Sequence, residues 1–287
     1  MLDTLNADTA ARTPTRYVES RGRQLAYRSI GEGQPVVLCA RFRGVMDVWD
    51  PGFLDALAAE GFRVITFDYS GLGLSSGEKD YNPASLAADA RDLMEALDLR
   101  EVVLGGWSLG GIAAQLTLLL YPERISHLLL IGTTPPGPLV KLAEQLFYDT
   151  ARIPAYGLEQ ELILFHEPAS AVSRAAGARS VARIADRRKD DRSPPVPLDF
   201  AVSYLGDAPK SAPFPVDSVL EMLRTTATPV LHLGGDHDII FPVENWYALN
   251  RQLPTLQLVT YGSAGHGPHH ERPEASARHV AAFVRGI

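Results

Sequence analysis

Gly105-Gly106-Trp107-Ser108-Leu109-Gly110-Gly111 is the stretch from which the rest of the chain can be interpreted. It follows the apolar residues 102–104 and precedes residues 112–116, whose pattern predicts a helix. A serine between two glycines at an abrupt strand-to-helix turn is the G-x-S-x-G nucleophile elbow. This turn strains the serine backbone and brings strand and helix so close that side chains at the flanking glycines would collide. The motif predicts that Ser108 is a nucleophile; the alternative is a serine that only caps the helix.

Composition limits the class of protein. The chain has 287 residues, 46% hydrophobic and 21% charged, which fits one α/β domain with an insertion. Its net charge of -7 argues against nucleic acid as a partner, and no apolar stretch reaches the roughly 20 residues of a membrane span. Residues 1–14 are polar and lack the apolar core of a secretory signal. The single cysteine, Cys39, cannot form an internal disulfide, so we expect a cytoplasmic protein with neither nucleic acid nor membrane as a partner.

Short apolar runs alternate with helical patterns along most of the chain. Two alternating segments around the turn at residues 21–23 predict an antiparallel hairpin. Further strands are expected at residues 35–40, 62–67, 102–104, 128–131, 230–233 and 256–259. Helices are expected at residues 53–60, 85–97 with Ser85 as N-cap, 112–120, 245–252 and 273–284. This alternation predicts an α/β fold in which helices flank a mostly parallel central sheet.

The alternation stops in the middle of the chain. Residues 135–215 are rich in proline and show helical periodicity without a buried strand. We interpret them as a helical cap inserted into a core made of residues 1–134 and 216–287. The charged run at residues 187–192 is interpreted as a solvated face.

A nucleophilic serine requires a base, and the base requires a carboxylate that fixes its tautomer. In a doubly wound sheet such groups lie just past the carboxyl ends of later strands. Asp238 follows the strand expected at residues 230–233, and His266 follows the strand that ends near Tyr261. The order serine, acid, histidine is the one used by α/β-hydrolases.

The chain resembles an α/β-hydrolase fold protein with a helical cap. Three motifs carry the resemblance: the elbow, G-x-x-D-x-x-x-P at residues 235–242, and G-H-x-x-H-x-E-x-P at residues 265–273. The resemblance implies a catalytic triad of Ser108, Asp238 and His266. It selects Asp238 over Asp236 because the family places the acid four residues before the proline; we expect Asp236 to hydrogen-bond its loop. It implies no cofactor, and no histidine pair has the spacing of metal ligands.

One loop departs from the family pattern. The family carries His-Gly before the residue whose backbone N–H completes the oxyanion hole, whereas Ala40 and Arg41 stand here and Phe42 takes the donor position. Leu109 would supply the second donor. We expect strain at Arg41, where the family has glycine.

Three residues near the elbow and one glycine-rich loop are further candidates for the substrate site. Arg41, Arg43 and Trp107 are candidate substrate-binding residues. The alternative for the two arginines is that they face solvent or pair with nearby aspartates, Asp47 and Asp50. The glycine-rich loop after Asp68 is expected to shape the rim of the pocket.

The expected function is that of a serine hydrolase acting on an ester, lactone, thioester or activated amide of a small, mostly apolar substrate. A C–C bond hydrolase, a lyase or a perhydrolase would use the same triad. A non-catalytic ligand-binding protein could use the same pocket. Dehalogenases and epoxide hydrolases of this fold need a carboxylate where Ser108 stands. No feature of the sequence sets an oligomeric state.

Overall fold

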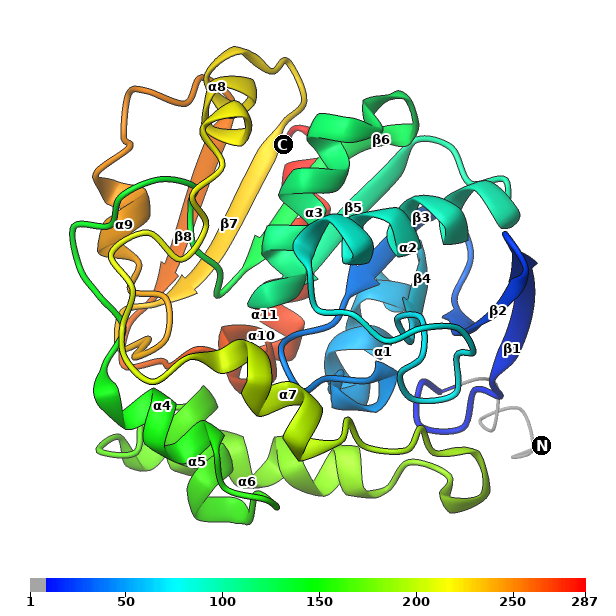
Figure 1. Ribbon diagram of the computed structural model, residues 1–287, viewed down its shortest axis with the longest axis horizontal. Coiled ribbons are helices and arrows are strands. Elements are labelled where there is room, and N and C mark those ends of the chain that lie inside the picture. Colours follow the sequence, from blue (N-terminus) through cyan, green and yellow to red (C-terminus); the bar gives the residue numbers. More distant parts are fainter. Residues whose placement is uncertain (1–8) are drawn as a thin grey trace.

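The computed structural model describes residues 9–287. The polar start expected at residues 1–14 therefore falls in part on residues 1–8, which lie outside the described residues. The sheet has eight strands in the order β1-β2-β4-β3-β5-β6-β7-β8 (Figure 1). The pairings β1–β2 and β2–β4 are antiparallel and the others are parallel, which confirms the predicted fold class. The strands are β1 (Arg16–Ser20), β2 (Arg23–Ile30), β3 (Gln34–Cys39), β4 (Phe62–Phe67), β5 (Val102–Trp107), β6 (Ile125–Ile131), β7 (Val230–Gly235) and β8 (Leu256–Tyr261).

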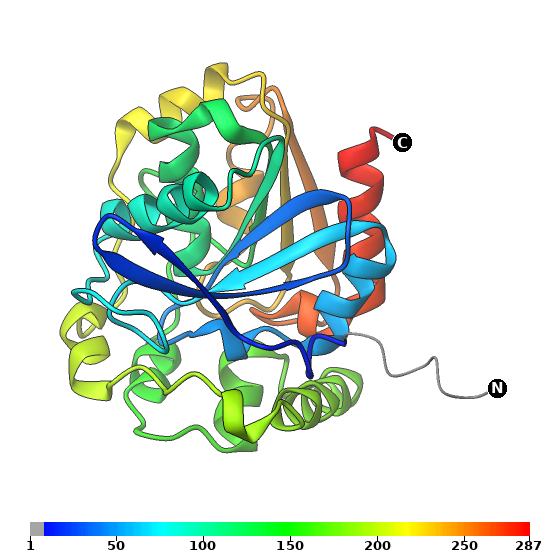
Figure 2. The same ribbon diagram turned by 90° about the vertical axis from the view of Figure 1, so that its right-hand side faces the viewer.

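Helices cover both faces of the sheet. Helices α1 and α11 pack on one face, and α2, α3 and α8 pack on the other (Figures 1 and 2). The helices that flank the sheet or follow its strands are α1 (Pro51–Ala59), α2 (Pro83–Ala96), α3 (Leu109–Leu120), α8 (Asp217–Thr225), α9 (Glu244–Tyr247), α10 (Pro268–Glu271) and α11 (Pro273–Arg285). Those between β6 and β7 are α4 (Gln145–Ala151), α5 (Leu158–Phe165), α6 (Ala171–Ala185) and α7 (Leu198–Leu205).

The central strands are apolar because both faces of the sheet are covered. Successive strand residues point to opposite faces, so Val37 belongs to the apolar cluster beneath α2 and α3, whereas Val36 belongs to the cluster beneath α1 and α11. Cys39 is fully buried in the first cluster, and burial raises the pKa of its thiol to about 12. The cysteine is therefore a small core residue and not a reactive thiol.

Several helices differ from the sequence prediction in where they begin or end. Helix α2 begins two residues before Ser85, because Asn82 is the N-cap and accepts a hydrogen bond from Ala84 N–H at 3.0 Å. The Ser85 hydroxyl instead donates to Asp80 Oδ2 at 2.7 Å. Helix α9 ends at Tyr247, and turns replace the rest of the helix expected at residues 245–252. The short helices α8 and α10 were not predicted.

Residues 135–215, called the cap from here on, lie across the carboxyl ends of the parallel strands (Figure 1). All of these residues are described, and none belongs to a strand. The prediction that residues 187–192 are only a solvated face is wrong at Arg187, whose side chain is 4% exposed. Its guanidinium donates to Ala11 O at 3.0 Å and pairs with Asp191 at 2.7 Å. The buried Arg187 side chain therefore joins the cap to the N-terminal segment.

The length and polarity of the helices bear on membrane insertion. Within residues 9–287, every helix is too short or too polar to span a lipid bilayer.

Candidate active site

Ser108 lies in the turn between β5 and α3 with φ 59° and ψ -121°, a backbone conformation that costs a non-glycine residue energy. Its N–H donates to Ile131 O at 3.0 Å, and Thr133 Oγ1 donates to its carbonyl at 2.7 Å. A Cβ atom at Gly106 would overlap Gly110 O, and one at Gly110 would overlap Cys39 O. The glycines are therefore required by close backbone approach, as the elbow motif predicts, and the turn presents the Ser108 side chain to a cavity.

His266 lies in the loop between β8 and α10. Its Nδ1 lies 2.7 Å from Oδ2 of Asp238, and both side chains are 1% exposed. A carboxylate only accepts, so Nδ1–H donates and Nε2 carries the free lone pair. Nε2 is buried and has no hydrogen-bond partner among residues 9–287. The histidine is thus held in the tautomer that can accept a proton at Nε2.

Asp238 is fixed by the backbone of its own loop. Oδ1 accepts from Ile240 N–H at 2.7 Å and from Phe241 N–H at 2.9 Å. Burial by itself raises the pKa of the carboxyl, but the imidazole of His266 and the two N–H donors together lower it by more. The pKa of Asp238 therefore lies below its ordinary value. Asp238 is therefore ionised at neutral pH. Asp236 makes a different contact: its Oδ1 pairs with His237 at 2.6 Å within the loop.

The carboxyl ends of the parallel strands β5 and β8, with β6 and β7 between them, lie at the same edge of the sheet, which brings the elbow and the His266 loop to that edge. Gly132 follows β6 directly after the residue that binds Ser108 N–H, and a Cβ atom there would lie 3.2 Å from Nδ1 of His266. The indole of Trp107 donates to the backbone carbonyl of His266 at 2.9 Å. Ser108 and His266 are therefore joined through their immediate neighbours.

The two expected oxyanion donors have no competing partners. Leu109 N–H is at the first position of α3, and Phe42 N–H is in the loop after β3. No hydrogen bond joins either N–H group to another of the described residues. The strain expected at Arg41 falls elsewhere: Arg43, with φ 55°, is the left-handed residue of this loop. Arg43 N–H donates to Tyr81 Oη at 3.0 Å, which secures the loop.

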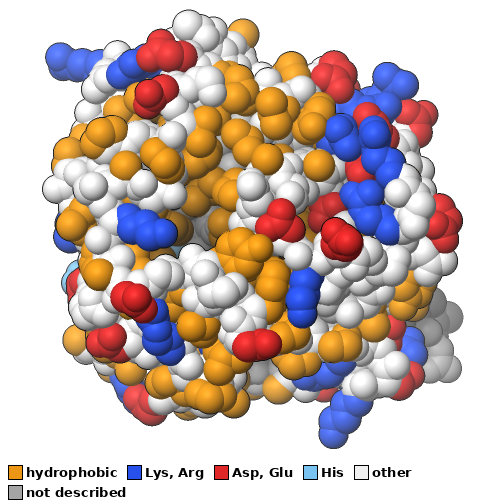
Figure 3. Space-filling model, in the orientation of Figure 1, with side chains coloured by type: hydrophobic (Ala, Val, Ile, Leu, Met, Phe, Trp, Pro, Cys, Tyr) orange, Lys and Arg blue, Asp and Glu red, His pale blue; other side chains and the backbone are white. Residues whose placement is uncertain are grey.

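A cavity of about 430 Å³ opens above Ser108. Apolar and aromatic side chains form most of its wall, and Figure 3 shows hydrophobic side chains gathered over the middle of one face of the molecule. Lys210 is the one charged residue among those that line the cavity. The lining residues are Phe42, Tyr81, Asn82, Pro83, Ser108, Leu109, Ile112, Leu139, Ala143, Phe147, Tyr148, Tyr204, Leu205, Lys210, Pro213, Ile240 and Phe241.

None of the three predicted substrate-binding residues is among those lining residues. Arg41 is 8% exposed, and its guanidinium lies 4.4 Å from the ring centre of Phe165 and 5.2 Å from that of Trp107. Burial lowers the pKa of Arg41. Arg43 points into the cap, where it donates to Ala151 O at 2.8 Å and to Tyr156 Oη at 2.9 Å. Both arginines therefore serve packing between cap and core.

The neighbouring acids have partners of their own. Asp47 pairs with Arg28 at 2.5 Å and Asp50 pairs with Arg183, so neither binds Arg41 or Arg43. Asp68 is buried and accepts from Met46 N–H at 2.6 Å and from Ser193 Oγ at 2.7 Å. It fastens the cap to the core, and it is not among the lining residues of the cavity.

The other histidines form no metal site. No group of three or more His, Cys, Asp or Glu side chains among residues 9–287 could hold an ion. His269 and His270 are buried against Trp107, whereas His237 is half exposed.

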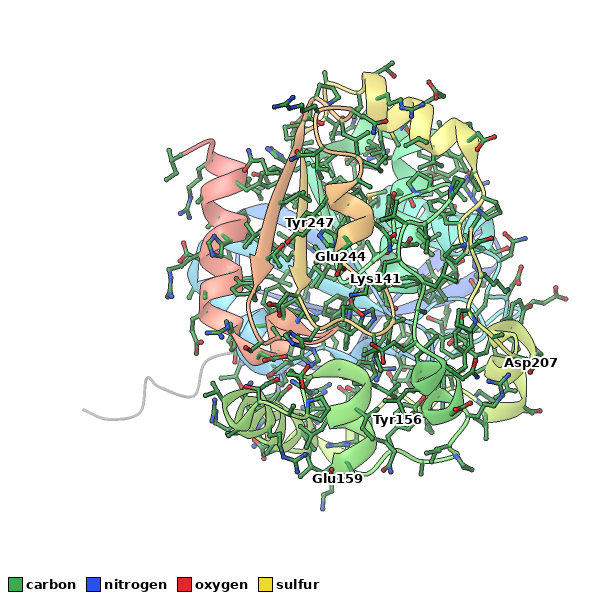
Figure 4. The ribbon with its side chains drawn as sticks, turned by 90° about the vertical axis from the view of Figure 1, so that its left-hand side faces the viewer. Lys141, Tyr156, Glu159, Asp207, Glu244 and Tyr247 are labelled. Carbon is green, nitrogen blue, oxygen red and sulfur yellow. The ribbon has the colours of Figure 1, made fainter. Side chains whose placement is uncertain are left out.

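Two residues of the site region were missed from the sequence. Tyr81 lines the cavity and also accepts from the oxyanion loop. Asn245 accepts from Val140 N–H at 2.9 Å and from Lys141 N–H at 3.0 Å, which fixes the start of the cap. Lys141 also pairs with Glu244 at 2.7 Å, and Figure 4 shows these two side chains together. The only sequence signal for Asn245 is its position three residues after Pro242 in the acid motif.

Comparisons of the sequence and of the structure with known proteins point to the same family. The sequence pattern of the alpha/beta hydrolase fold family matches residues 34–273. The protein BpoC of Mycobacterium tuberculosis, named as a non-heme bromoperoxidase, is 29% identical over 92% of this chain and 98% of its own. An alpha/beta hydrolase fold protein from Chitinophaga pinensis is 29% identical with a TM-score of 0.80, covering 96% of this chain and 98% of its own. A thermophilic esterase from Thermogutta terrifontis is 25% identical with a TM-score of 0.69, covering 95% and 98%.

Proposed function

Because the chain belongs to the α/β-hydrolase fold family, we propose that it is a serine hydrolase that cleaves an ester, a lactone, a thioester or an activated amide. One observation carries the proposal: Asp238 holds Nδ1 of His266, and the buried Nε2 has no partner among the described residues, Ser108 Oγ included, so it is free to take a proton. The strained Ser108 opens on the cavity. The family match and a solved relative described as an esterase support a hydrolase activity in general.

The mechanism follows from these atoms. Ser108 Oγ attacks the substrate carbonyl as Nε2 of His266 takes its proton, and the ionised Asp238 stabilises the resulting imidazolium. Backbone N–H groups of Leu109 and Phe42 stabilise the negative oxygen of the tetrahedral intermediate. His266 then protonates the leaving group, which departs and leaves an acyl group on Ser108. Water, deprotonated by His266, releases the acid and restores the serine.

The cavity limits the substrate to a small, mostly apolar molecule. Its wall includes the aromatic rings of Phe42, Phe147 and Phe241, which favour alkyl or aryl groups. Each added CH₂ that the cavity buries contributes about 0.8 kcal/mol, which corresponds to about a fourfold gain in kcat/KM. We therefore expect kcat/KM for p-nitrophenyl esters to rise from acetate to longer acyl chains until the cavity is filled.

The cap supplies part of the cavity wall, including Phe147, Tyr148 and Leu205. It would therefore set specificity and exclude water from the acyl-enzyme. This role matches the proposed division of the chain into a core of residues 1–134 and 216–287 and a cap of residues 135–215.

The test is to mix the protein with a fluorophosphonate probe and, separately, with p-nitrophenyl esters. We expect stoichiometric labelling of Ser108 and a loss of kcat on the order of 10⁶-fold in Ser108→Ala. Ser218→Ala is a matched control, because it is the same substitution at an exposed position of α8 that is not among the lining residues of the cavity. A well-folded protein with an unreactive Ser108 would overturn the proposal in favour of a ligand-binding role.

A further inference from the structure

Trp107 directly precedes Ser108 and is 1% exposed, yet it is not among the residues that line the cavity. Its indole N–H donates to the backbone carbonyl of His266 at 2.9 Å, in a buried hydrogen bond between residues 159 positions apart. One side chain at the end of the nucleophile's strand therefore holds the loop that carries the base.

The indole is itself fixed on several sides. Its ring centre lies 4.7 Å from those of His269 and His270, 5.2 Å from that of Phe165 and 6.0 Å from that of Trp49. The guanidinium of Arg41 lies 5.2 Å from the same ring. Close packing on this scale leaves a side chain one rotamer, so the N–H group has one direction in which to donate.

Among the described residues, the other hydrogen bonds that hold the loop around His266 come from partners outside β5. Gly265 N–H donates to Glu271 Oε1 at 2.9 Å, Gly267 N–H donates to Phe165 O at 2.7 Å, and the His266 imidazole donates to Asp238. These contacts fix the loop to α10, to α5 of the cap and to the acid loop. Trp107 alone among these partners belongs to the strand that positions Ser108.

We propose that Trp107 is a positioning residue that sets the separation of Ser108 and His266. This inference rests on the proposed function, and it replaces the interpretation of Trp107 as a substrate-binding residue. A group that acts by spacing the nucleophile and the base affects the chemical step and leaves ground-state binding unchanged. Loss of its N–H group therefore lowers kcat and leaves KM unchanged.

The central variant is Trp107→Phe, which keeps an aromatic ring and removes the donor. The matched control is Trp49→Phe: Trp49 is 2% exposed in the same cluster, but its Nε1 has no partner among the described residues. Both variants lose the same atoms from the same packed region. We expect kcat to fall by about tenfold to a hundredfold in Trp107→Phe only.

A second measurement reports on His266 without turnover. In proton NMR, the Nδ1 proton shared between His266 and Asp238 gives a downfield resonance, which His266→Ala assigns by removing it. We expect this resonance to shift or broaden in Trp107→Phe and to stay in place in Trp49→Phe. In protein labelled with ¹⁵N-tryptophan, the Trp107 indole proton exchanges more slowly than that of Trp49. Trp49→Phe and Trp246→Phe assign the three indole signals even where Trp107→Phe does not fold.

The outcomes separate this inference from the proposed function. A fall in kcat at unchanged KM, with a displaced His266 resonance, supports the positioning role. An equal loss in Trp49→Phe, an unmoved His266 resonance in Trp107→Phe, or a fast-exchanging Trp107 indole proton overturns it. If wild-type protein neither turns over esters nor labels at Ser108, the proposed function fails, and the resonance and exchange measurements still decide whether Trp107 holds His266.

Discussion

Arg183 in cap helix α6 forms a bidentate ion pair with Asp50, the N-cap residue of α1. Nε lies 2.7 Å from Oδ1 and Nη2 lies 2.5 Å from Oδ2. The Asp50 side chain is fully buried, whereas a third of the Arg183 side chain is exposed. Burial by itself raises the pKa of Asp50, but the hydrogen bonds from Arg183 lower it by more than burial raises it. The pKa of Asp50 is therefore below its ordinary value. The pair fastens the cap to the core, and its stabilisation is present near neutral pH and lost as the pH falls below 3.8.

Arg183→Met should lower the free energy of unfolding by about 3 kcal/mol, because it leaves the buried Asp50 carboxylate without its partner. Urea unfolding at pH 7 measures the change. The matched control is Arg174→Met on the same helix, since both partners of its pair with Glu159 are exposed and the pair should contribute little to stability. Equal effects of the two substitutions would contradict this prediction.

Stability should decrease from pH 7 to pH 5 because of three buried histidines. Burial lowers the pKa of both His232 and His270 to about 3, and it lowers the pKa of His269 well below its ordinary value. Below pH 6.5 these histidines bind protons in the unfolded chain but not in the folded protein. The free energy of unfolding therefore falls by about 1.4 kcal/mol per histidine for each pH unit between 6.5 and about 3.

Urea unfolding of wild type and His270→Gln at both pH values tests this dependence. The variant should lose about a third of the pH dependence contributed by the three histidines. His237→Gln is the control, because the carboxylate of Asp236 raises the pKa of His237, and stabilisation from that pair is lost as pH rises. A pH dependence that is the same in His270→Gln and wild type would show that His270 does not titrate as expected.

Gly110→Ala should lower the free energy of unfolding by about 2–3 kcal/mol or more, because the added Cβ overlaps the carbonyl of Cys39 and neither backbone can retreat. Thermal and urea unfolding give the magnitude. Gly262→Ala is the control: its nearest atom, Oδ2 of Asp236, would lie 3.8 Å from the new Cβ, so little change is expected. Similar stability of both variants would mean that the elbow is looser than its contacts indicate.

Phe42→Pro should lower kcat by about 10²- to 10³-fold, because proline has no N–H group to stabilise the oxyanion. Phe42→Ala keeps the N–H group and removes the same ring from the cavity wall, so the comparison of kcat between the two variants isolates the backbone donor. Circular dichroism checks that both variants are folded. Equal kcat values would remove Phe42 from the oxyanion hole.

Local patterns in the sequence were enough to predict the eight strands, most of the helices that flank them and the fold class. Apolar runs such as residues 62–67 reflect burial on both sheet faces, and the glycines at 106 and 110 reflect a turn with no room for a side chain. The resemblance to α/β-hydrolases, which place the acid four residues before a proline, selected Asp238, and the structure places its carboxylate 2.7 Å from Nδ1 of His266. Each of these features depends on a few residues close together in the chain, so it can be recognised from the sequence.

The directions of long side chains could not be predicted in this way. Arg41, Arg43 and Trp107 were candidates for substrate binding, and for the two arginines the alternative was solvent exposure or pairing with nearby aspartates. The structure instead packs Arg41 on Phe165, bonds Arg43 to Ala151 O, and directs the Trp107 indole to His266 O. Each partner lies more than 100 residues away along the chain, and such contacts exist only after the cap and the later strands have folded against the elbow. The sequence by itself determined which residue types stand at the strand ends; the tertiary structure decided which of them meet, because that choice depends on packing between distant segments.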